Sequence, residues 1–404
     1  MEKRLVPKLR FPEFKDNWEE KRLREISTNV SYGMNSASTT FDGTNKYIRI
    51  TDINEQNNLF TPNPLTSPVE IVDSKFKLKE NDLLFARTGA STGKSYLYKK
   101  DDGNLFFAGF LIKFSILSTY NSKFIFYNTL RSSYKKWVKI MSTRSGQPGI
   151  NAEEYKTLKV YIPNIKEQKK IADFLSAVDS KIEKLERKKE LLEDYKKGMM
   201  QKIFSQEIRF KDNSGNDYPE WEEKKLGEIL RLNLRPVPKP LTPYGALGIR
   251  SHAKGTMHKK IENPNEISMD TLYKVKENDF IVSITFAWEH AVAICKKEDN
   301  GRLVSHRFPT YTANFNLNIN YFKHYIKRKQ FKFSLSMISP GGAGRNRVMS
   351  KKDFSNIKCM LPSLLEQEKI AEFLSAIDSK IKKLETLIEN NKKFKKGLLQ
   401  QIFI

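Results

Sequence analysis

Apolar residues recur in two stretches of the chain at alternating steps of three and four residues. The second stretch runs from Ile370 to Ile402, and the first from Ile171 to Ile203. This spacing is the a/d pattern of a coiled coil, and each stretch predicts a helix about 55 Å long. We expect the two helices to pack on each other; the alternative is two amphipathic helices that pack only on their own domains. Polar residues interrupt the seams and are expected to fix the register at a cost in stability: Lys189, Lys196, Asn391 and Lys395.

The remaining chain shows short apolar runs that are separated by turn residues, a pattern typical of β-strands. A helical stretch comes after each set, at residues 124–139 and 321–335. We therefore predict two globular parts of α+β type. The expected strands contain residues 46–50, 75–78, 82–86, 95–99 and 105–114 in the first part, and 246–250, 272–275, 279–284, 291–295 and 306–315 in the second.

The whole chain is one unit written twice. Residues 167–204 and 366–403 are identical at 23 of 38 positions, and WEEKRLREI from Trp18 matches WEEKKLGEI from Trp221. Each copy is a globular part followed by a long helix. The segment after the first helix, EIRFKDN, resembles the start of the chain, KLRFPEFKDN. The N-terminal segment can therefore take the same place at the end of the second helix, in a pseudo-two-fold arrangement with antiparallel helices.

The net charge is +25, and the globular parts carry most of it. Residues 1–160 hold 26 basic and 17 acidic side chains, and residues 211–360 hold 26 and 15, which gives +9 and +11. An excess of this size favours a nucleic-acid partner. The sequence has no long uncharged apolar run and no disulfide framework, since its two cysteines stand alone. We expect a soluble cytoplasmic protein that contacts no membrane.

No known catalytic or metal-binding motif occurs in the sequence. GASTGKS, from Gly89 to Ser95, has three residues between its glycines where a P-loop needs four, so a hairpin turn is the better interpretation. Glu19 and Lys21 form an E-x-K that recurs at Glu222 and Lys224; without an upstream aspartate, a charge pair at a helix start is expected. We predict that the chain has no catalytic, cofactor-binding or metal site.

Two polar, glycine-containing loops precede the short segments that end at Pro163 and Pro362. Glycine lets the backbone approach a ligand, and Arg, Gln and Asn can pair with base edges. A flexible polar loop without function is the simpler alternative. The predicted DNA-binding residues are Arg87, Thr88, Ser91, Lys94, Arg144, Gln147 and Asn151 in the first part, and Arg250, His252, Lys254, Arg307, Arg345, Asn346 and Arg347 in the second, with Ser251 and Trp288 beside them.

The repeated EQ-x-K-I-A-x-F-L-S-A-x-D-S-K-I motif, with a globular part before each copy, resembles the specificity subunit of type I restriction–modification enzymes. The resemblance covers essentially the whole chain. It implies target-recognition domains at residues 1–165 and 207–364, each reading half of a split DNA site. The helices at 166–206 and 365–404 would form a spacer, an antiparallel coiled coil.

The resemblance also implies partners. Methyltransferase subunits, two by expectation, would dock on the helices and methylate adenine with S-adenosylmethionine, and a restriction and translocase subunit would use ATP and Mg²⁺. Apolar side chains beside the seam are the predicted docking residues: Phe174, Ala177, Phe373 and Ala376. Two alternatives remain: a non-specific DNA-bridging protein and a single-chain DNA-modifying enzyme.

Overall fold

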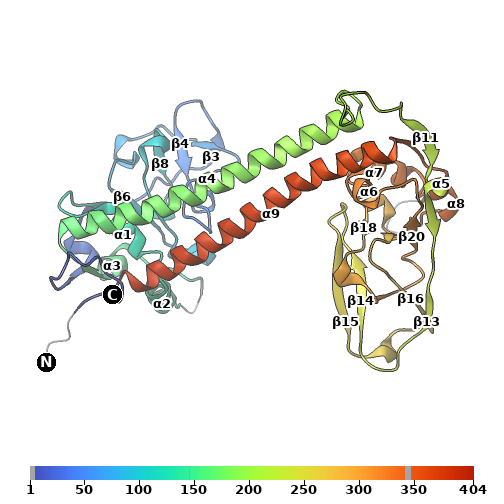
Figure 1. Cartoon of the computed structure of the whole chain (residues 1–404). Helices are drawn as coiled ribbons and strands as arrows, with labels where there is room; N and C mark the ends of the chain where they lie inside the picture. The colour runs from blue at the N-terminus through green and yellow to red at the C-terminus, as the bar shows by residue number, and fades with distance from the viewer. Residues whose placement is uncertain (1–4, 145, 342–346) are drawn as a thin grey trace. The chain divides into compact units, whose positions relative to one another are not determined.

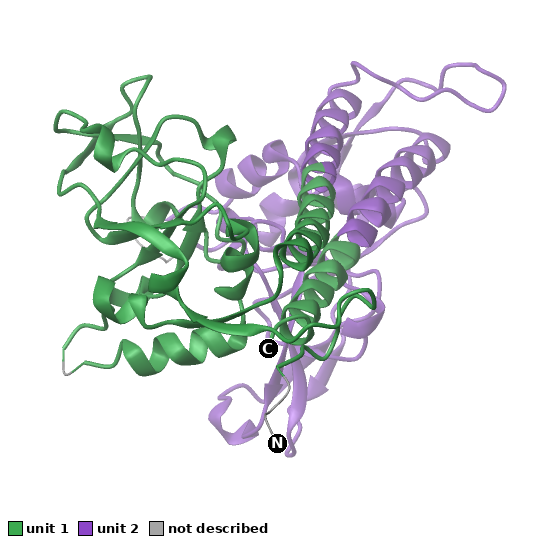
Figure 2. Ribbon diagram, turned by 90° about the vertical axis from the view of Figure 1, so that its left-hand side faces the viewer, with its two compact units in different colours: residues 1–187, 385–404 green, residues 188–384 purple. Residues whose placement is uncertain are grey.

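The computed structural model describes residues 5–144, 146–341 and 347–404, and the chain divides into two compact units. Unit 1 comprises residues 1–187 and 385–404, and unit 2 comprises residues 188–384. Each long helix changes unit along its length, as the colours in Figure 2 show. Each unit therefore contains one globular part and a stretch of both helices. Across the described ranges, no helix has the length and apolar character needed to cross a membrane.

Unit 1 is built on a four-stranded antiparallel sheet in the order β2-β9-β6-β7 (Figure 1). Strands β1 and β10 form a separate antiparallel pair, β3 pairs with β5, and β4 lies parallel to β8. The strands are β1 (Glu19–Arg22), β2 (Ser27–Tyr32), β3 (Ser38–Thr40), β4 (Lys46–Ile48), β5 (Thr66–Pro68), β6 (Asp82–Ala86), β7 (Ser95–Leu97), β8 (Leu105–Phe107), β9 (Leu111–Ile116) and β10 (Lys159–Ile162). The helices are α1 (Ser122–Asn128), α2 (Ser132–Met141), α3 (Ala152–Lys156) and α4 (Ile165–Phe204).

Unit 2 repeats the four-stranded sheet, in the order β12-β20-β17-β18, and the pair β11-β21. It adds a five-stranded sheet in the order β13-β16-β19-β14-β15. The strands are β11 (Glu222–Lys225), β12 (Leu230–Leu232), β13 (Pro236–Pro238), β14 (Tyr244–Ile249), β15 (Thr256–Ile261), β16 (Thr271–Lys274), β17 (Phe280–Val282), β18 (Val292–Ile294), β19 (Leu303–Val304), β20 (Thr310–Ala313) and β21 (Lys358–Leu361). The helices are α5 (Leu226–Ile229), α6 (Ile319–Tyr325), α7 (Lys329–Met337), α8 (Lys351–Asn356) and α9 (Leu364–Gln401).

The predicted α+β class is confirmed, and three local predictions are wrong. Residues 105–114 form two strands, β8 and β9, because residues 108–110 make a turn in which the N–H of Leu111 donates to the carbonyl of Ala108 at 2.9 Å. Residues 75–78 form no strand, because Ser74–Phe76 is a 3-10 turn that Asp73 caps through its side chain. Each predicted helical stretch is two helices, α1 with α2 and α6 with α7. The break has a local cause, since Arg131 and Arg328 adopt extended backbone angles before the second helix of each pair.

The two helical seams are confirmed. Every a/d position of α4 and α9 is buried or half-buried, including the polar ones. In unit 1, Lys395 of α9 lies 2.6 Å from the Asp179 carboxylate of α4, and Lys392 lies 2.6 Å from Glu186. As the residue numbers rise along α4, those of the paired residues on α9 fall, so the two helices run antiparallel. In unit 2 the equivalent pair joins Lys196 to Asp378 at 2.5 Å.

The start of the chain completes the end of α9, as the repeat predicted. In unit 1 the backbone N–H of Leu9 donates to the carbonyl of Gln401 at 2.9 Å. In unit 2 the N–H of Ile208 donates to the carbonyl of Lys202 at 3.2 Å. Phe403 closes the core of unit 1 against Phe124 of α1, and Phe204 closes that of unit 2 against the equivalent Tyr321 of α6. The two units therefore use the same closing contacts, one across separate chain segments and one along a continuous segment.

A buried glutamate lies in the first turn of each long helix. Both Glu167 and Glu366 are 0% exposed. Glu167 accepts two hydrogen bonds of 2.8 Å from Arg10 and one of 3.4 Å from the Trp18 indole. Glu366 accepts the same set from Arg209 and Trp221, at 3.0–3.3 Å and 3.1 Å. The carboxylate thus joins the helix to the segment before the first strand of each unit.

We predict that Arg10→Ala destabilises unit 1 by about 3–5 kcal/mol, because it leaves a buried carboxylate without its cation. The measurement is the free energy of unfolding by chemical denaturation. Lys8→Ala is the matched control, since it removes a neighbouring charge from an exposed position. A loss below about 1 kcal/mol in Arg10→Ala, equal to that of the control, would contradict the prediction.

Candidate nucleic-acid interface

In unit 1 the predicted loop before Pro163 lies against the segment that holds the other predicted DNA-binding residues, Arg87 to Lys94. Thr88 forms an antiparallel bridge with Gly149, and the N–H of Gly89 donates to the carbonyl of Pro148 at 2.9 Å. The N–H of Ile150 donates to the carbonyl of Arg87 at 2.9 Å. The loop after β6 and the loop before α3 therefore form one surface. Gly89 has φ +69°, a conformation that glycine adopts without strain.

Three neighbouring residues hold the side chain of Arg87. Its Nε–H donates to the carbonyl of Gly109 at 3.0 Å. Its guanidinium carbon lies 5.0 Å from the ring centre of Tyr32 and 5.8 Å from that of Phe110, within cation–π range. Both rings are exposed, Tyr32 by 42% and Phe110 by 56%. Sequence reasoning missed both aromatics; the only signal was a glycine next to each, at Gly33 and Gly109.

Three other predicted residues of unit 1 make internal contacts. Asn151 caps α3 and accepts from the N–H of Glu154 at 2.9 Å. Arg144 pairs with the Glu154 carboxylate, and Lys94 lies 3.1 Å from Glu55. The remaining three line the same loops: Thr88 and Ser91, both half-buried, and the exposed Gln147.

In unit 2 the loop between β14 and β15 lies against the turn between β17 and β18. The N–H of His252 donates to the carbonyl of Glu289 at 2.9 Å, and the Ser251 hydroxyl donates to the Glu289 carboxylate at 2.6 Å. His252 has φ +61°. Arg250 and Lys254 are exposed on the same loop.

The third loop of unit 2 joins this turn. The Arg347 guanidinium carbon lies 5.3 Å from the Trp288 ring centre. The N–H of Met349 donates to the carbonyl of Ile284 at 2.7 Å, and the N–H of Ile284 donates to the carbonyl of Arg307 at 3.0 Å. Residues predicted from separate parts of the sequence therefore lie on one surface. Arg345 and Asn346 lie outside the described residues.

The predicted docking residues on the helices differ in solvent exposure. Phe174 and Phe373 are half-buried, and each packs edge-on against an aromatic of the preceding segment, Phe11 at 5.8 Å and Phe210 at 5.5 Å. Ala177 and Ala376 are exposed. These aromatics thus already have partners within their own units, and only part of each ring surface is open.

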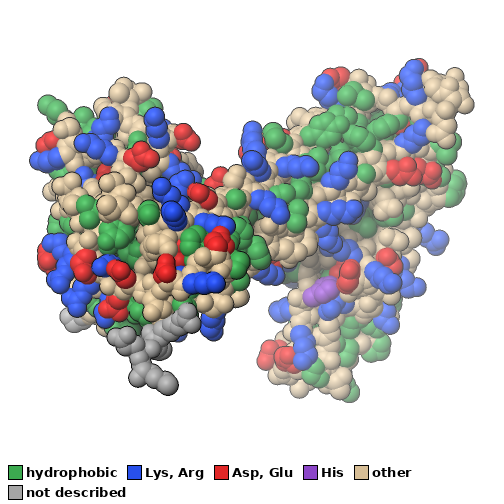
Figure 3. Space-filling model, turned by 60° about the vertical axis from the view of Figure 1, so that its left-hand side comes forward, with side chains coloured by type: hydrophobic (Ala, Val, Ile, Leu, Met, Phe, Trp, Pro, Cys, Tyr) green, Lys and Arg blue, Asp and Glu red, His purple; other side chains and the backbone are tan. Residues whose placement is uncertain are grey.

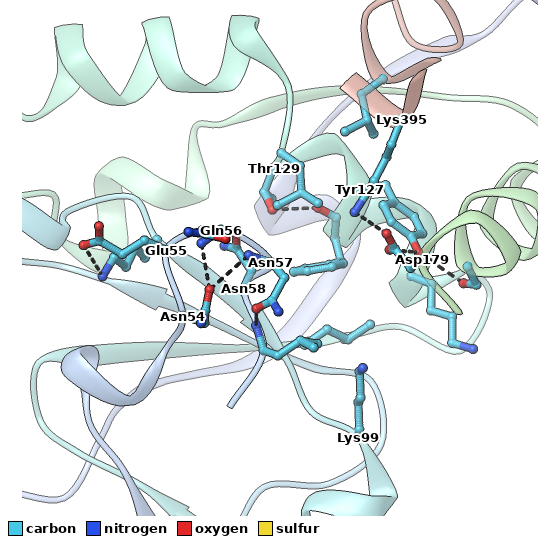
Figure 4. Close-up of a pocket in the computed structure, with 18 of the residues that line it drawn as sticks. Asn54, Glu55, Gln56, Asn57, Asn58, Lys99, Tyr127, Thr129, Asp179 and Lys395 are labelled. Carbon is cyan, nitrogen blue, oxygen red and sulfur yellow. Dashed lines mark hydrogen bonds and ion pairs between the residues drawn. The ribbon is translucent and has the colours of Figure 1, made fainter. Parts of the chain in front are cut away.

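Unit 1 also contains an open groove of about 1140 Å³ between its globular part and the helices (Figure 4). The loop Asn54–Asn58 forms one wall, and Lys395, Asp179 and Tyr127 form the opposite side. Asp179 accepts from the Tyr127 hydroxyl at 2.9 Å as well as from Lys395. This carboxylate ties both helices to the globular part; burial and the neighbouring negative charge raise the Tyr127 pKa well above its usual range.

In unit 2 His324 takes the place of Tyr127. Its Nε2 lies 3.2 Å from the Ser375 hydroxyl and its Nδ1 lies 3.9 Å from Asp378. Burial and the nearby Lys196 lower the His324 pKa to about 3, so the ring is neutral at pH 7. Burial opposes ionisation of Asp378, but the hydrogen bond from Lys196 together with the positive charges of Lys196 and Lys327 outweighs it, so the Asp378 pKa is lowered.

On the face in Figure 3, Lys and Arg side chains are interspersed with Asp and Glu. Among the residues that the structure describes, no group of three or more His, Cys, Asp or Glu side chains could hold a metal ion.

Two sequence motifs have structural explanations. GASTGKS forms the predicted hairpin connection, since β6 and β7 pair antiparallel on either side of it. Glu19 and Lys21 do form an ion pair, at 3.0 Å, but they lie on strand β1. The expected helix start is therefore wrong; the register of β1 with β10 places these residues on a strand.

Two known proteins are similar to this chain in sequence over most of their lengths. A protein of Methanocaldococcus jannaschii named as the MjaX specificity subunit of a type I restriction enzyme is 26% identical, over 97% of this chain and 94% of its own. The MjaVIII specificity subunit of the same organism is 25% identical, over 82% and 80%.

Solved structures agree in fold. The type I restriction–modification S subunit from M. genitalium superposes with a TM-score of 0.57 at 16% identity, over 99% of each chain. The HsdS subunit from Thermoanaerobacter tengcongensis gives 0.50 at 16% identity, over 96% of each chain. The sequence itself matches a family twice, over residues 15–193 and 218–391, and this covers most of the chain. The chain therefore belongs to the type I restriction modification DNA specificity domain family, and its role is to provide DNA sequence specificity.

Proposed function

We propose that each unit reads one half of a bipartite double-stranded DNA site, and that the helices set the distance between the halves. The supporting observation is that both units place two loops on the same backbone ladder, through Ile150 and Arg87 in unit 1 and through Met349 and Ile284 in unit 2. The scaffold is repeated while the side chains on it differ. Two readers of different sequences require this combination.

The charge distribution supports the same assignment. The excess of basic residues lies in the globular parts, at +9 and +11, and both loop clusters contain arginines. Phosphate contacts supply most of the affinity of such a surface, and contacts to base edges supply the specificity.

We assign the partners from what the family resemblance implies. Methyltransferase subunits, two by the internal repeat, dock on the helices and carry S-adenosylmethionine, and a restriction and translocase subunit carries ATP and Mg²⁺ in the cytoplasm. Docking by Phe174, Ala177, Phe373 and Ala376 extends to exposed apolar residues farther along the helices. These residues are Leu191 and Tyr195 in unit 2, and Leu387 and Phe394 in unit 1.

We predict modular specificity. Replacing residues 1–160 with the equivalent part of a relative should change one half of the methylated site and leave the other half intact, because the recognition loops of each unit lie on its own sheet. The measurement is mapping of methylated adenines in DNA that is exposed to the chain with its methyltransferase subunits. A change in both halves together would contradict independent readers.

Assays of the chain alone distinguish the two alternative functions, a single-chain enzyme and a DNA-bridging protein. Without the methyltransferase subunits, the chain should bind DNA and leave it unmodified. Methylation or cleavage by the chain alone, with cofactors supplied, would indicate a single-chain enzyme. Equal affinity for all duplexes at fixed salt would indicate a bridging protein.

A second prediction concerns Arg347. Arg347→Ala should weaken binding to the cognate site by about 1–3 kcal/mol if the guanidinium reads a guanine. A phosphate contact would instead weaken binding to all sequences alike and lower the salt slope by about one. Titrations of cognate and unrelated duplexes at several salt concentrations separate these results, and unchanged binding would leave the loop without a role in DNA contact.

A third prediction tests the spacer. Inserting four residues after Glu186 and four after Glu385, its equivalent in the repeat, adds about 6 Å to each helix and nearly preserves the helical face. At about 3.4 Å per base pair, the gap between half-sites should widen by one or two base pairs. Methylation mapping should show both half-site sequences unchanged. A fixed gap with retained activity would mean that the helices do not set the spacing.

A further inference from the structure

Each unit has an equivalent backbone hydrogen bond at the edge of its recognition loops, and we call the two residues that it joins a rung. In unit 1 the N–H of Arg87 donates to the carbonyl of Phe110 at 3.0 Å; in unit 2 the N–H of Ile284 donates to the carbonyl of Arg307 at 3.0 Å. The next hydrogen bond is also repeated, from Ile150 to Arg87 and from Met349 to Ile284. Arg87 is therefore equivalent to Ile284, and Phe110 to Arg307.

The side chains on this rung are exchanged between the units. Unit 1 carries its arginine at the first position, with an apolar residue opposite. Unit 2 carries an apolar residue at the first position and its arginine opposite. Each rung thus bears one guanidinium, in unit 1 on the segment after β6 and in unit 2 on the segment before β20. Phe110 and Arg307 are exposed, and Arg87 and Ile284 are half-buried.

Neither arginine is neutralised within its unit. Across residues 5–144, 146–341 and 347–404, Arg87 and Arg307 have no carboxylate partner at ion-pair distance. Other half-buried cations of the two units do have such a partner: Lys94 pairs with Glu55, and Arg235 pairs with Asp279 at 2.6 Å. An unpaired guanidinium beside a recognition loop is available to a ligand.

The Arg87 guanidinium is also held in one orientation. Gly109 fixes the Nε–H, and Tyr32 and Phe110 contact the group as cation–π partners. The terminal nitrogens are then the groups left to donate outward. A planar guanidinium with fixed orientation matches two adjacent acceptors, and in a duplex the guanine O6 and N7 in the major groove provide them.

We propose that this rung is a guanine-reading position in each domain, with Arg87 as the reader in unit 1 and Arg307 as the reader in unit 2. The proposal rests on the proposed function, because it names the base class that each domain recognises. Each half-site then contains at least one G·C pair that is read by a single arginine. The exchange across the rung shifts the two arginines relative to their scaffolds, so the guanine occupies a different position within each half-site.

The test uses the full chain assembled with its methyltransferase subunits. Methylated sites are mapped for the wild type and for Arg87→Ala, Arg87→Lys and Arg307→Ala. Arg87→Ala should lower discrimination at one G·C position of one half-site by roughly 5- to 150-fold, and should leave the other half-site unchanged. Arg307→Ala should do the same in the other half-site only.

Arg87→Lys separates base reading from phosphate contact. Lysine keeps the charge but lacks the planar pair of donors, so it should not restore discrimination. Recovery with lysine, or an equal loss at all sequences, would overturn the proposal. Arg24→Ala, at an exposed position of unit 1, is the matched control for loss of charge, and thermal melting checks that each variant is folded.

The methylation maps test the proposed function and the assignment of the rung separately. If the wild-type assembly methylates no bipartite site, the proposed function fails. If the wild type gives a bipartite site and both alanine variants keep its sequence, only the assignment of the rung fails.

Discussion

The hydrogen-bonded glutamate in the first turn of each long helix is the interaction on which the architecture depends. Glu167 and Glu366 are fully buried carboxylates. Each is held by one arginine and one tryptophan from the segment before the first strand of its unit. A buried carboxylate is stable only with such partners. Its position therefore fixes where the helix leaves the domain, and the seams continue from that point.

The scaffold and the recognition loops are held by different kinds of interaction. Apolar seams and paired charges such as Lys196 with Asp378 hold the helices, and these repeat in both units. The loops are held by backbone hydrogen bonds, which place few demands on the side chains. This division lets the side chains of the loops, which we propose face DNA, differ between the units while the scaffold stays the same.

The sequence predicted the parts of the fold that depend on spacing. The seams, the repeat and the closing of the C-terminal helix by the N-terminal segment are all consequences of periodicity, and the structure confirms them. The stacking of Arg87 on Tyr32 and Phe110 could not be predicted, because it joins three residues far apart in the chain. The E-x-K pair was placed on a helix because local charge spacing does not report strand pairing; β10, the partner of β1, lies about 140 residues later.

Unit 2 is formed by one segment of the chain and unit 1 by two, and this difference affects the order in which the units can fold during synthesis. Unit 2 is one continuous segment, residues 188–384, whereas unit 1 needs residues 385–404 to complete its core, through Phe403 and its neighbours. Domains generally fold as units while the ribosome extends the chain. Unit 2 can therefore close as soon as its own residues have emerged. Unit 1, although most of it is translated before unit 2, exposes the site that Phe403 fills until residues 385–404 are made, so unit 1 becomes native after unit 2.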